Sequence, residues 1–292
     1  MLIVPAPAKL NLALAVVARR PDGWHDIDTV LVPIDWHDLI GIDVRPATMT
    51  SVELRLTGPA SAGVPDGDRN LAARAARALA GAAGIPMQIN LWLDKRVPHG
   101  AGLGGGSADA AAALQAGARR LAALGRSVNR SALREAALSV GSDVPALLAG
   151  VPSRVAGRGE RVTPIASPSL DVVVVSTVPS STADTYAAVT EQDMVSDGRV
   201  SRLIDALTAG ESIAGALLGS ALERAAVQAN PAVGQAIARA RASVPEVAWH
   251  LTGSGGALCA VATTTAEARA LARRMRDAGF AARACRTLAA PG

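Results

Sequence analysis

A glycine-rich loop is the segment of this sequence best suited to bind an anion. The loop leads directly into residues 108–124, an alanine-rich stretch with few signals that compete with a helix. Small residues let the backbone approach a ligand closely, and the N–H groups and dipole at a helix start favour phosphate oxygens. We therefore expect phosphate to bind to the loop Gly100-Ala101-Gly102-Leu103-Gly104-Gly105-Gly106-Ser107.

Two common glycine motifs do not fit this loop. It lacks the lysine of a Walker A loop, and no acidic residue ends a later strand at the spacing of a dinucleotide-binding fold. Taken alone, the loop also fits a tight turn that packs against its own helix.

Two lysines stand apart in a chain that otherwise uses arginine for its positive charge. Of the 29 basic residues 27 are arginine, and the two lysines are Lys9 and Lys95. An ammonium group is a compact point charge and a guanidinium is a planar fork, so a retained lysine indicates a site that needs the point charge. Two ordinary surface lysines are the alternative.

Asp143 lies at a corner of the predicted fold. A helix expected over residues 131–139 ends before Gly141, and Pro145 prevents a smooth continuation. An aspartate at the following helix start is either an N-cap or a proton acceptor, and the two roles can coexist.

The elements that must position these residues are a mixture of strands and helices. Strand patterns cover residues 10–17, 52–56, 87–93, 161–165, 172–175, 249–251 and 257–262, with a closing strand after the last helix. Helical patterns cover residues 70–81, 108–124, 131–139, 202–207, 214–224, 232–242 and 266–278. We expect an α+β fold with an N-terminal lobe, residues 1–160, that carries the glycine loop, and a C-terminal lobe, residues 161–292.

The composition argues against several other classes of protein. Apolar stretches are interrupted well before the ~18 residues of a transmembrane helix, and no basic run precedes the apolar N-terminal residues. Cys259 and Cys285 are too few for a disulfide framework, so we expect buried thiols in a reducing cytoplasm. The net charge of +4 comes from arginines dispersed among alanines without interleaved aromatics. We therefore expect neither a membrane nor a nucleic acid as partner.

Three motifs occur in an order that resembles the GHMP kinases. Pro98 and Leu103 frame the glycine loop as in the phosphate-binding motif of that family. The family's first motif resembles Pro7-Ala8-Lys9-Leu10-Asn11-Leu12, and its third resembles Leu251-Thr252-Gly253-Ser254-Gly255-Gly256-Ala257. The resemblance implies a two-lobed GHMP kinase fold, an active site in the cleft between the lobes, and ATP-dependent phosphorylation of a small alcohol.

Five further segments resemble one group within that family, the 4-diphosphocytidyl-2-C-methyl-D-erythritol kinases. They are Arg20-Pro21-Asp22-Gly23-Trp24-His25-Asp26, Asp68-x-Asn70-Leu71, Asp94-Lys95-Arg96-Val97-Pro98, Gly141-Ser142-Asp143-Val144-Pro145 and Ser181-Thr182-Ala183-Asp184-Thr185-Tyr186. This resemblance implies phosphorylation of the 2-hydroxyl of that substrate, in the non-mevalonate route to isoprenoid precursors. Both lysines fall within matching motifs, which disfavours the surface alternative.

The resemblance also implies roles for individual residues in the reaction with ATP. Asp143 would accept the proton of the substrate hydroxyl, and Lys9 would lie beside it and hold it ionised. Magnesium is implied, with the Ser107 hydroxyl nearby but no firm set of protein ligands. ATP would be bound by Asn70, Lys95, Pro98, His99, Gly100, Ala101, Gly102, Leu103, Gly104, Gly105, Gly106, Ser107 and Ala108, with Gly253, Ser254 and Gly255 of the third motif close to its phosphates.

The aromatic residues are the ones implied in substrate recognition. Trp24 and Tyr186 match positions that sandwich a cytosine ring, and His25 matches the position that reads its edge. Asn11 and Thr182 match polar contacts to the methylerythritol or diphosphate portion. Core packing of the two aromatics, and an ordinary turn position for His25, are the alternatives.

The sequence departs from the family pattern at two places, and two other functions are compatible with the three motifs. Trp24 stands where tyrosine is usual, and Ser220-Ala221-Leu222-Glu223 replaces an Asn-Asp-Leu-Glu-like segment, a change expected to affect only packing. A kinase of homoserine or mevalonate, or a non-catalytic ATP-binding regulator, would share the three motifs. The sequence leaves the oligomeric state open.

Overall fold

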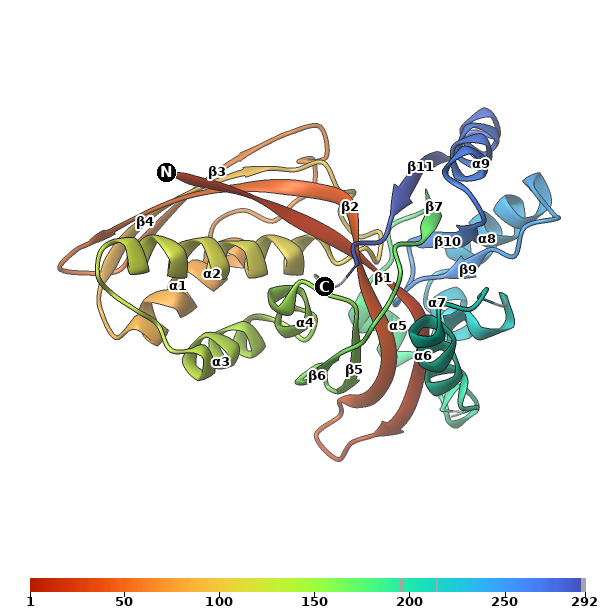
Figure 1. The fold of residues 1–292 in the computed structure, drawn as a ribbon, viewed down its shortest axis with the longest axis horizontal. Coiled ribbons are helices and arrows are strands. Elements are labelled where there is room, and N and C mark those ends of the chain that lie inside the picture. The colour runs from red at the N-terminus through yellow and green to blue at the C-terminus, as the bar shows by residue number, and fades with distance from the viewer. Residues whose placement is uncertain (195–196, 214, 290–292) are drawn as a thin grey trace. The chain divides into compact units, whose positions relative to one another are not determined.

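The computed structural model describes residues 1–194, 197–213 and 215–289, and the structural statements below concern these residues. In chain order (Figure 1) the elements are β1 (Leu2–Arg19), β2 (His25–Pro46), β3 (Ser51–Thr57), η1 (Gly67–Arg69), α1 (Leu71–Ala83), β4 (Met87–Asp94), α2 (Gly105–Ala123), α3 (Arg130–Val140), α4 (Val144–Ala149), β5 (Ser153–Gly157), β6 (Arg161–Pro164), β7 (Asp171–Ser176), α5 (Thr182–Ala187), η2 (Glu191–Asp193), α6 (Arg199–Ala209), η3 (Gly215–Leu217), β8 (Gly219–Ser220), α7 (Glu223–Ala229), α8 (Pro231–Ser243), β9 (His250–Leu251), β10 (Ala257–Ala262), α9 (Thr265–Asp277) and β11 (Ala281–Arg286). The α+β class expected from the sequence is confirmed.

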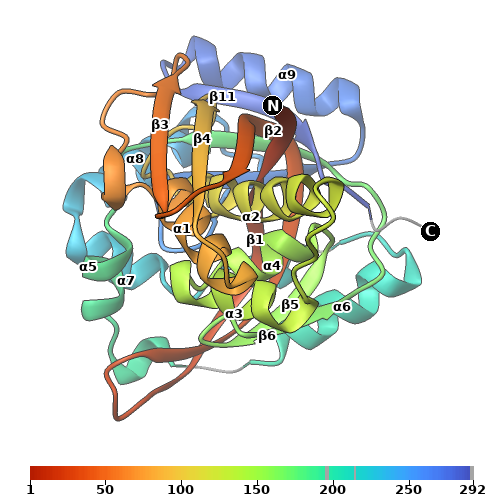
Figure 2. The same ribbon diagram turned by 90° about the vertical axis from the view of Figure 1, so that its left-hand side faces the viewer.

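One compact unit consists of Met1–Ala8, Trp36–His99 and Gly104–Gly150. In it β2 pairs antiparallel with β4, and β4 pairs in parallel with β3. Figures 1 and 2 show α1, α2 and α3 on one side of these strands. Side chains alternate along β4, and its buried ones, such as Ile89 and Leu91, join the helices in one apolar core.

The close approach of α1 and α2 depends on a residue without a side chain. A Cβ atom at Gly117 of α2 would lie 2.3 Å from Cδ2 of Leu79 on α1, so a larger residue here would displace the buried Leu79 side chain. The contact holds α2, and with it the helix start that follows the glycine loop.

The other compact unit consists of Lys9–Asp35, Gly100–Leu103 and Val151–Gly292. Its antiparallel sheet has the strand order β11-β7-β10-β9, and the four buried valines of β7 show that this strand is covered on both faces. Helices α8 and α9 contribute Ile237 and Met275 to its core. In the same unit β1 pairs in parallel with β8, and β2 pairs antiparallel with β5.

The two units are discontinuous in sequence because two strands are very long. β1 and β2 each contribute residues to both units, in a sheet with the strand order β3-β4-β2-β1-β8. Residues 9–35 therefore group with the second half of the chain, and residues 100–103 do so because Gly102 packs against Gly255. The domain boundary at residue 160 stays a prediction.

Most elements expected from the sequence are present, and one helix was wrong. Residue 214 lies outside the described residues, and the rest of the expected 214–224 helix is a short 3-10 turn, strand β8, and only then α7 from Glu223. The reason is Gly219, whose φ of +122° cannot continue a helix.

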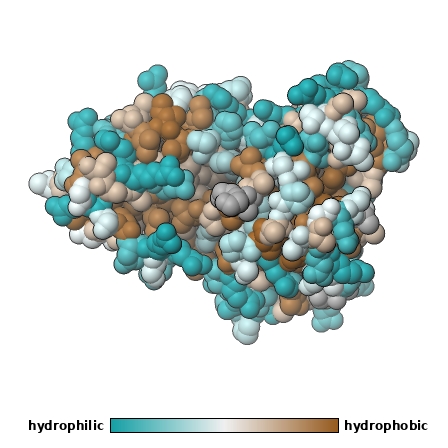
Figure 3. Space-filling view, viewed as in Figure 1, coloured by the Kyte–Doolittle hydropathy of each residue, from teal (hydrophilic) through white to brown (hydrophobic). Residues whose placement is uncertain are grey.

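Apolar and hydrophilic residues are interspersed on the face shown in Figure 3. The exposed large hydrophobic residues include Met1, Ile3 and Met49. Within the described ranges, no helix combines the length and the apolar character needed to cross a bilayer. The two cysteines are buried free thiols, as expected, and burial raises the pKa of each to about 12.

Candidate active site

The glycine loop and the third glycine motif pack backbone against backbone. A Cβ atom at Gly102, where φ is +72°, would lie 2.3 Å from the carbonyl oxygen of Gly255. One at Gly256 would lie 2.5 Å from the oxygen of Gly100. No side chain fits at these positions, so residues 100–103 and 252–256 form one surface. The alternative of a loop that packs only against its own helix is thereby excluded.

Lys9 anchors this surface from strand β1. Its backbone N–H donates to the oxygen of Leu103 at 2.9 Å, and its Nζ donates to the oxygen of Gly102 at 3.0 Å and to Oδ1 of Asn11 at 2.6 Å. The Lys9 side chain is buried, and a Cβ atom at Gly253 would lie 3.1 Å from its Nζ. The ammonium group thus lies beside the third glycine motif, as a cation for a phosphate site would.

Asn11 is held by hydrogen bonds from three directions. Its Oδ1 accepts from Lys9, its Nδ2 donates to Oγ1 of Thr29 at 2.8 Å, and its backbone N–H donates to Oγ1 of Thr252 at 2.8 Å. Thr29 in turn donates to the oxygen of Ala13 at 2.6 Å. Asn11 therefore orients the Lys9 ammonium group.

The third glycine motif is fixed by hydroxyl groups. Oγ of Ser220 donates to the oxygen of Gly253 at 2.7 Å, and Oγ1 of Thr185 donates to the oxygen of Ser254 at 3.1 Å. The hydroxyls of Thr182 and Ser254 are 2.8 Å apart. The substitution at Ser220 therefore touches the glycine motif itself, so the expectation that it concerns only packing was wrong.

After residues 100–103 the chain continues into α2, which belongs to the same unit as the residues that precede the loop. Gly104 has φ of +66° at the N-cap of α2 and leaves the cap without a side-chain hydrogen bond, so the first N–H groups of the helix have no competing side chain. Ala108 closes the first turn by donating to the oxygen of Gly104 at 2.8 Å. Pro98 and His99 precede the loop, and Gly106 packs on Leu71, where a Cβ atom would be 3.4 Å from Cδ1.

Asp143 is half-buried at the N-cap position of α4, but its side chain makes no capping hydrogen bond. Pro145 at the start of that helix removes one of the N–H groups that a cap would satisfy. Ser107 lies near the same corner, because a Cβ atom at Gly141 would be 3.9 Å from its Oγ. The capping role considered for Asp143 thus receives no support.

Lys95 is fully buried between two carboxylates. Its Nζ donates to Oδ2 of Asp38 at 2.5 Å and to Oδ2 of Asp109 at 2.9 Å, and its side chain is 2 % exposed. Burial raises the pKa of Asp109 to about 8, against the opposing charge of Lys95. Burial alone would lower the pKa of Lys95, but the charges of Asp109 and Asp38 raise it. The surface alternative for Lys95 is wrong.

Asn70 is also an internal residue. Its Oδ1 caps α1 by accepting from the N–H of Ala72 at 2.9 Å, and its Nδ2 donates to the oxygen of Pro65 at 2.9 Å. A simple surface role is therefore excluded, and its part in nucleotide binding stays a prediction.

Two of the predicted cytosine-reading residues, His25 and Tyr186, lie side by side in the unit that holds Lys9–Asp35 and Val151–Gly292. The rings of His25 and Tyr186 have centroids 5.4 Å apart, and Nε2 of His25 is buried with no hydrogen-bond partner. Burial, and then the charge of Arg19, lower the pKa of His25, so the imidazole is neutral at pH 7. Trp24 is 49 % exposed, which excludes the core role considered for it. A buried, unpartnered ring nitrogen beside the Tyr186 ring is a position whose hydrogen bonding a heterocyclic ligand would complete.

Arg158, which no sequence pattern singled out, lies against Trp24. Its guanidinium carbon lies 4.1 Å from the centroid of the Trp24 ring, a cation–π contact. Nothing in the sequence distinguishes this arginine from the others. Asp38 and Asp109 were also missed, because each is separated in sequence from Lys95, the lysine that it binds.

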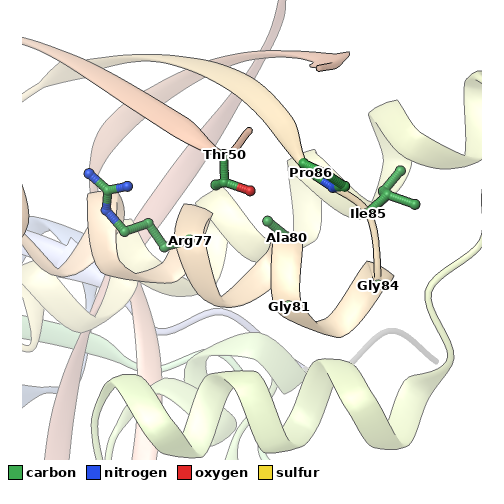
Figure 4. Close-up of a pocket in the computed structure, with 7 residues that line it drawn as sticks. All are labelled: Thr50, Arg77, Ala80, Gly81, Gly84, Ile85 and Pro86. Carbon is green, nitrogen blue, oxygen red and sulfur yellow. The ribbon is translucent and has the colours of Figure 1, made fainter. Parts of the chain in front are cut away.

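The structure offers no ready-made metal cage within its described residues, where no three His, Cys, Asp or Glu side chains cluster. A separate, open pocket lies beside the C-terminal half of α1 (Figure 4), and its charged residue, Arg77, is already paired with Asp68. It is lined by Thr50, Arg77, Ala80, Gly81, Gly84, Ile85 and Pro86.

Comparison with known proteins agrees with this geometry. Residues 70–151 match the GHMP kinases N terminal domain. The 4-diphosphocytidyl-2-C-methyl-D-erythritol kinase of Paramagnetospirillum magneticum is 37% identical over 274 residues, 93% of each chain, and that of Xanthomonas euvesicatoria pv. vesicatoria is 36% identical over 271 residues, 92% of this chain and 85% of the relative.

Solved structures show the same fold. A crystal structure of 4-(cytidine 5'-diphospho)-2C-methyl-D-erythritol kinase matches 99% of this chain and 100% of its own, with a TM-score of 0.78 and 33% identity. A homoserine kinase from Cytophaga hutchinsonii, at 16% identity and a TM-score of 0.67 over 98% of this chain and 94% of its own, shares the fold alone. This chain is an ATP-dependent small-molecule kinase that belongs to the 4-diphosphocytidyl-2-C-methyl-D-erythritol kinase family of GHMP kinases.

Proposed function

We propose that this protein transfers the γ-phosphoryl group of ATP to the 2-hydroxyl of 4-diphosphocytidyl-2-C-methyl-D-erythritol, in the non-mevalonate route to isoprenoid precursors. The observation that carries the substrate assignment is the buried, unpartnered Nε2 of His25 beside the Tyr186 ring. A cytosine edge offers both donors and acceptors, so it can complete the hydrogen bonding of a neutral imidazole.

Recognition of the base is completed by aromatic faces. Trp24 and Tyr186 supply flat apolar surfaces for stacking, and Arg158 packs on the Trp24 indole and holds it in place. The indole keeps the stacking face of the tyrosine that is usual here and lacks only its hydroxyl. Asn11 and Thr182 are proposed to contact the methylerythritol or diphosphate portion.

The phosphates of ATP are proposed to bind at the glycine loop. The positive φ angles at Gly100, Gly102 and Gly104 orient backbone N–H groups in a way that side-chain-bearing residues rarely allow. The N-terminus of α2 adds its dipole, and no side chain caps it. Asn70 is proposed to shape the nucleoside end of the site directly, and Lys95 is proposed to act on nucleotide binding through the segment that leads into the loop.

The chemical step needs a proton acceptor and a cation for the substrate hydroxyl. Asp143 is proposed to take the hydroxyl proton while the hydroxyl oxygen forms its bond to the γ-phosphorus, and the bond to the β-phosphate oxygen breaks to release ADP. Lys9 is proposed to orient the hydroxyl and to favour the ionised form of Asp143, with Asn11 fixing its ammonium group.

Magnesium would enter with ATP and supply neutralisation of the phosphate charge. Magnesium commonly retains water and phosphate ligands, so it would need no complete set of protein ligands. The Ser107 hydroxyl, at the first turn of α2, is the proposed protein contact.

Replacement of the proposed base tests the chemical assignment. Asp143→Asn preserves the shape of the side chain, and we expect turnover with the cytidyl substrate to fall by about 10²- to 10⁴-fold, the usual worth of a general base. The melting temperature is measured beside turnover, so that a loss of activity caused by misfolding is recognised. Turnover close to that of the wild-type protein would reject the role.

A further inference from the structure

The two ends of the glycine loop are tied to one buried group of charges. Lys95 immediately follows β4 and precedes the loop, whereas Asp109 lies on the second turn of α2, after the loop. The 2.9 Å bond between Lys95 Nζ and Asp109 Oδ2 therefore spans the segment that binds phosphate. A change in this bond would alter the separation of the two ends of the loop.

Asp38 holds the leading end of the loop by its backbone as well. Its Oδ1 accepts from the N–H of Arg96 at 2.5 Å and from the N–H of Val97 at 2.8 Å, and its Oδ2 accepts from Lys95 Nζ. One carboxylate thus satisfies three donors on consecutive residues. Asp38 is fully buried on β2, so it fixes these residues against the sheet.

Gly105 lets the ammonium group reach the helix. A Cβ atom at Gly105, the first residue of α2, would lie 3.1 Å from Lys95 Nζ and 3.2 Å from Cγ1 of Val97. The buried charges therefore pack directly under the helix turn whose N–H groups are proposed to face the phosphates.

We propose that Asp38 and Asp109 are positioning residues for the nucleotide, which form with Lys95 a buried clamp that sets the shape of the phosphate-binding loop. The inference rests on the proposed function only for the location of ATP at this loop. Because the Lys95 side chain is 2 % exposed and already bonded to both carboxylates, its ammonium group acts through the loop instead of contacting ATP.

The two aspartates call for different substitutions. In Asp38→Asn the amide nitrogen must face either two backbone N–H groups or the Lys95 ammonium group, so a donor meets a donor in both orientations. Oδ1 of Asp109 has no partner, so Asp109→Asn can keep an oxygen toward Lys95, whereas Asp109→Ala cannot. We therefore expect loss in Asp38→Asn and Asp109→Ala, and recovery of most of that loss in Asp109→Asn.

Asp43 provides a matched control. It lies on the same strand, β2, and pairs with Arg120 near the C-terminal end of α2, at 3.1 Å. Asp43→Asn therefore weakens a link between the same two elements, far along the helix from the loop.

Direct titration of each variant with Mg·ATP, without any acceptor, is the test, followed by the KM values for ATP and for the cytidyl substrate. A hydrogen bond to a charged group is worth about tenfold or more in an equilibrium constant, so we expect ATP affinity to fall at least about tenfold in Asp38→Asn and Asp109→Ala. In these two variants the KM for the cytidyl substrate should stay within about twofold of wild type. In Asp43→Asn the ATP affinity should also stay within about twofold of wild type. Since the titration needs no acceptor, failure of the substrate assignment would leave this test intact.

Trypsin gives a second measurement that does not depend on activity. Cleavage after Arg96 should accelerate in Asp38→Asn relative to cleavage after the exposed Arg126, and Mg·ATP should slow it. If Asp38→Asn does not fold, the pair Asp109→Ala and Asp109→Asn decides. Unchanged ATP affinity in Asp109→Ala, or an equal loss in Asp43→Asn, would overturn the proposal.

Discussion

A single methyl group at Gly102 should separate the two glycine segments. In Gly102→Ala the new Cβ atom would lie 2.3 Å from the oxygen of Gly255 and 3.1 Å from that of Thr252. Both neighbours are backbone atoms, so no side-chain rotation can relieve the contact. To restore ordinary van der Waals separation, the loop or the third motif must shift by about 1 Å.

The loss of unfolding free energy in Gly102→Ala has two parts that can be measured separately. Alanine in the left-handed conformation costs about 1–2 kcal/mol, and forcing an extra carbon into a packed site costs about 1–3 kcal/mol. Gly125 has the same φ of +72°, and a Cβ atom there would meet no other atom within 4 Å, so Gly125→Ala carries only the first cost. We expect Gly102→Ala to lose about 2–5 kcal/mol of unfolding free energy and Gly125→Ala about 1–2 kcal/mol.

Urea unfolding and steady-state kinetics on both variants provide the assay. A shift of about 1 Å at the phosphate site predicts a fall of about 10- to 100-fold in kcat/KM for ATP in Gly102→Ala, and none in Gly125→Ala. If the two variants matched in stability and in kcat/KM, the close contact between the glycine segments would play no part in the site, and our reasoning would be refuted.

Two further predictions concern single contacts, and a third concerns the pKa of Asp109. Arg158→Ala should raise the KM for the cytidyl substrate by about two- to fivefold and leave the KM for ATP unchanged, since an exposed cation–π contact contributes about 0.5–1 kcal/mol; equal changes in both KM values would contradict this. Ser220→Ala removes the hydrogen bond to Gly253 and should cost about 1 kcal/mol in urea unfolding, with a loss of ATP affinity; unaltered ATP affinity would show that the motif needs no such anchor. Because the pKa of Asp109 is raised to about 8, the folded state holds a proton that the unfolded state releases near pH 4, so stability should decline as the pH rises from about 4 to 8. Asp109→Asn should lack that part of the decline when unfolding free energies are compared at pH 5 and pH 8, and parallel declines in both proteins would count against it.

The elements with strong periodicity were predictable from the sequence. The α1 helix and the β4 strand were expected at nearly their observed bounds, because each buries one face of a regular pattern. The full extent of β2 was not predictable, because its residues 29–34 are all buried and so show no alternation of polar and apolar residues. Around residue 219 the apolar composition suggested a helix, and a single glycine conformation prevented it.

Some residues of the candidate site could be predicted from the sequence and others could not. Lys95 could be singled out by composition, since lysine is rare in this chain, and the structure shows that it is buried and paired with Asp38. Its partners could not, because Asp38 is 57 residues away and acidic residues are common. Arg158 could not be told apart from the other arginines of the chain, 27 in all. Its contact with Trp24 depends on the position of the turn between β5 and β6.

Release of ADP from Mg·ATP in the presence of 4-diphosphocytidyl-2-C-methyl-D-erythritol, compared with homoserine and mevalonate at equal concentration, tests the central claim most directly, with Asp143→Asn as the blank. We predict turnover with the cytidyl substrate alone, lost in the blank. Turnover of homoserine or mevalonate instead would contradict the substrate assignment and the roles of Trp24, His25 and Tyr186, and ATP binding without turnover of any acceptor would contradict the kinase itself.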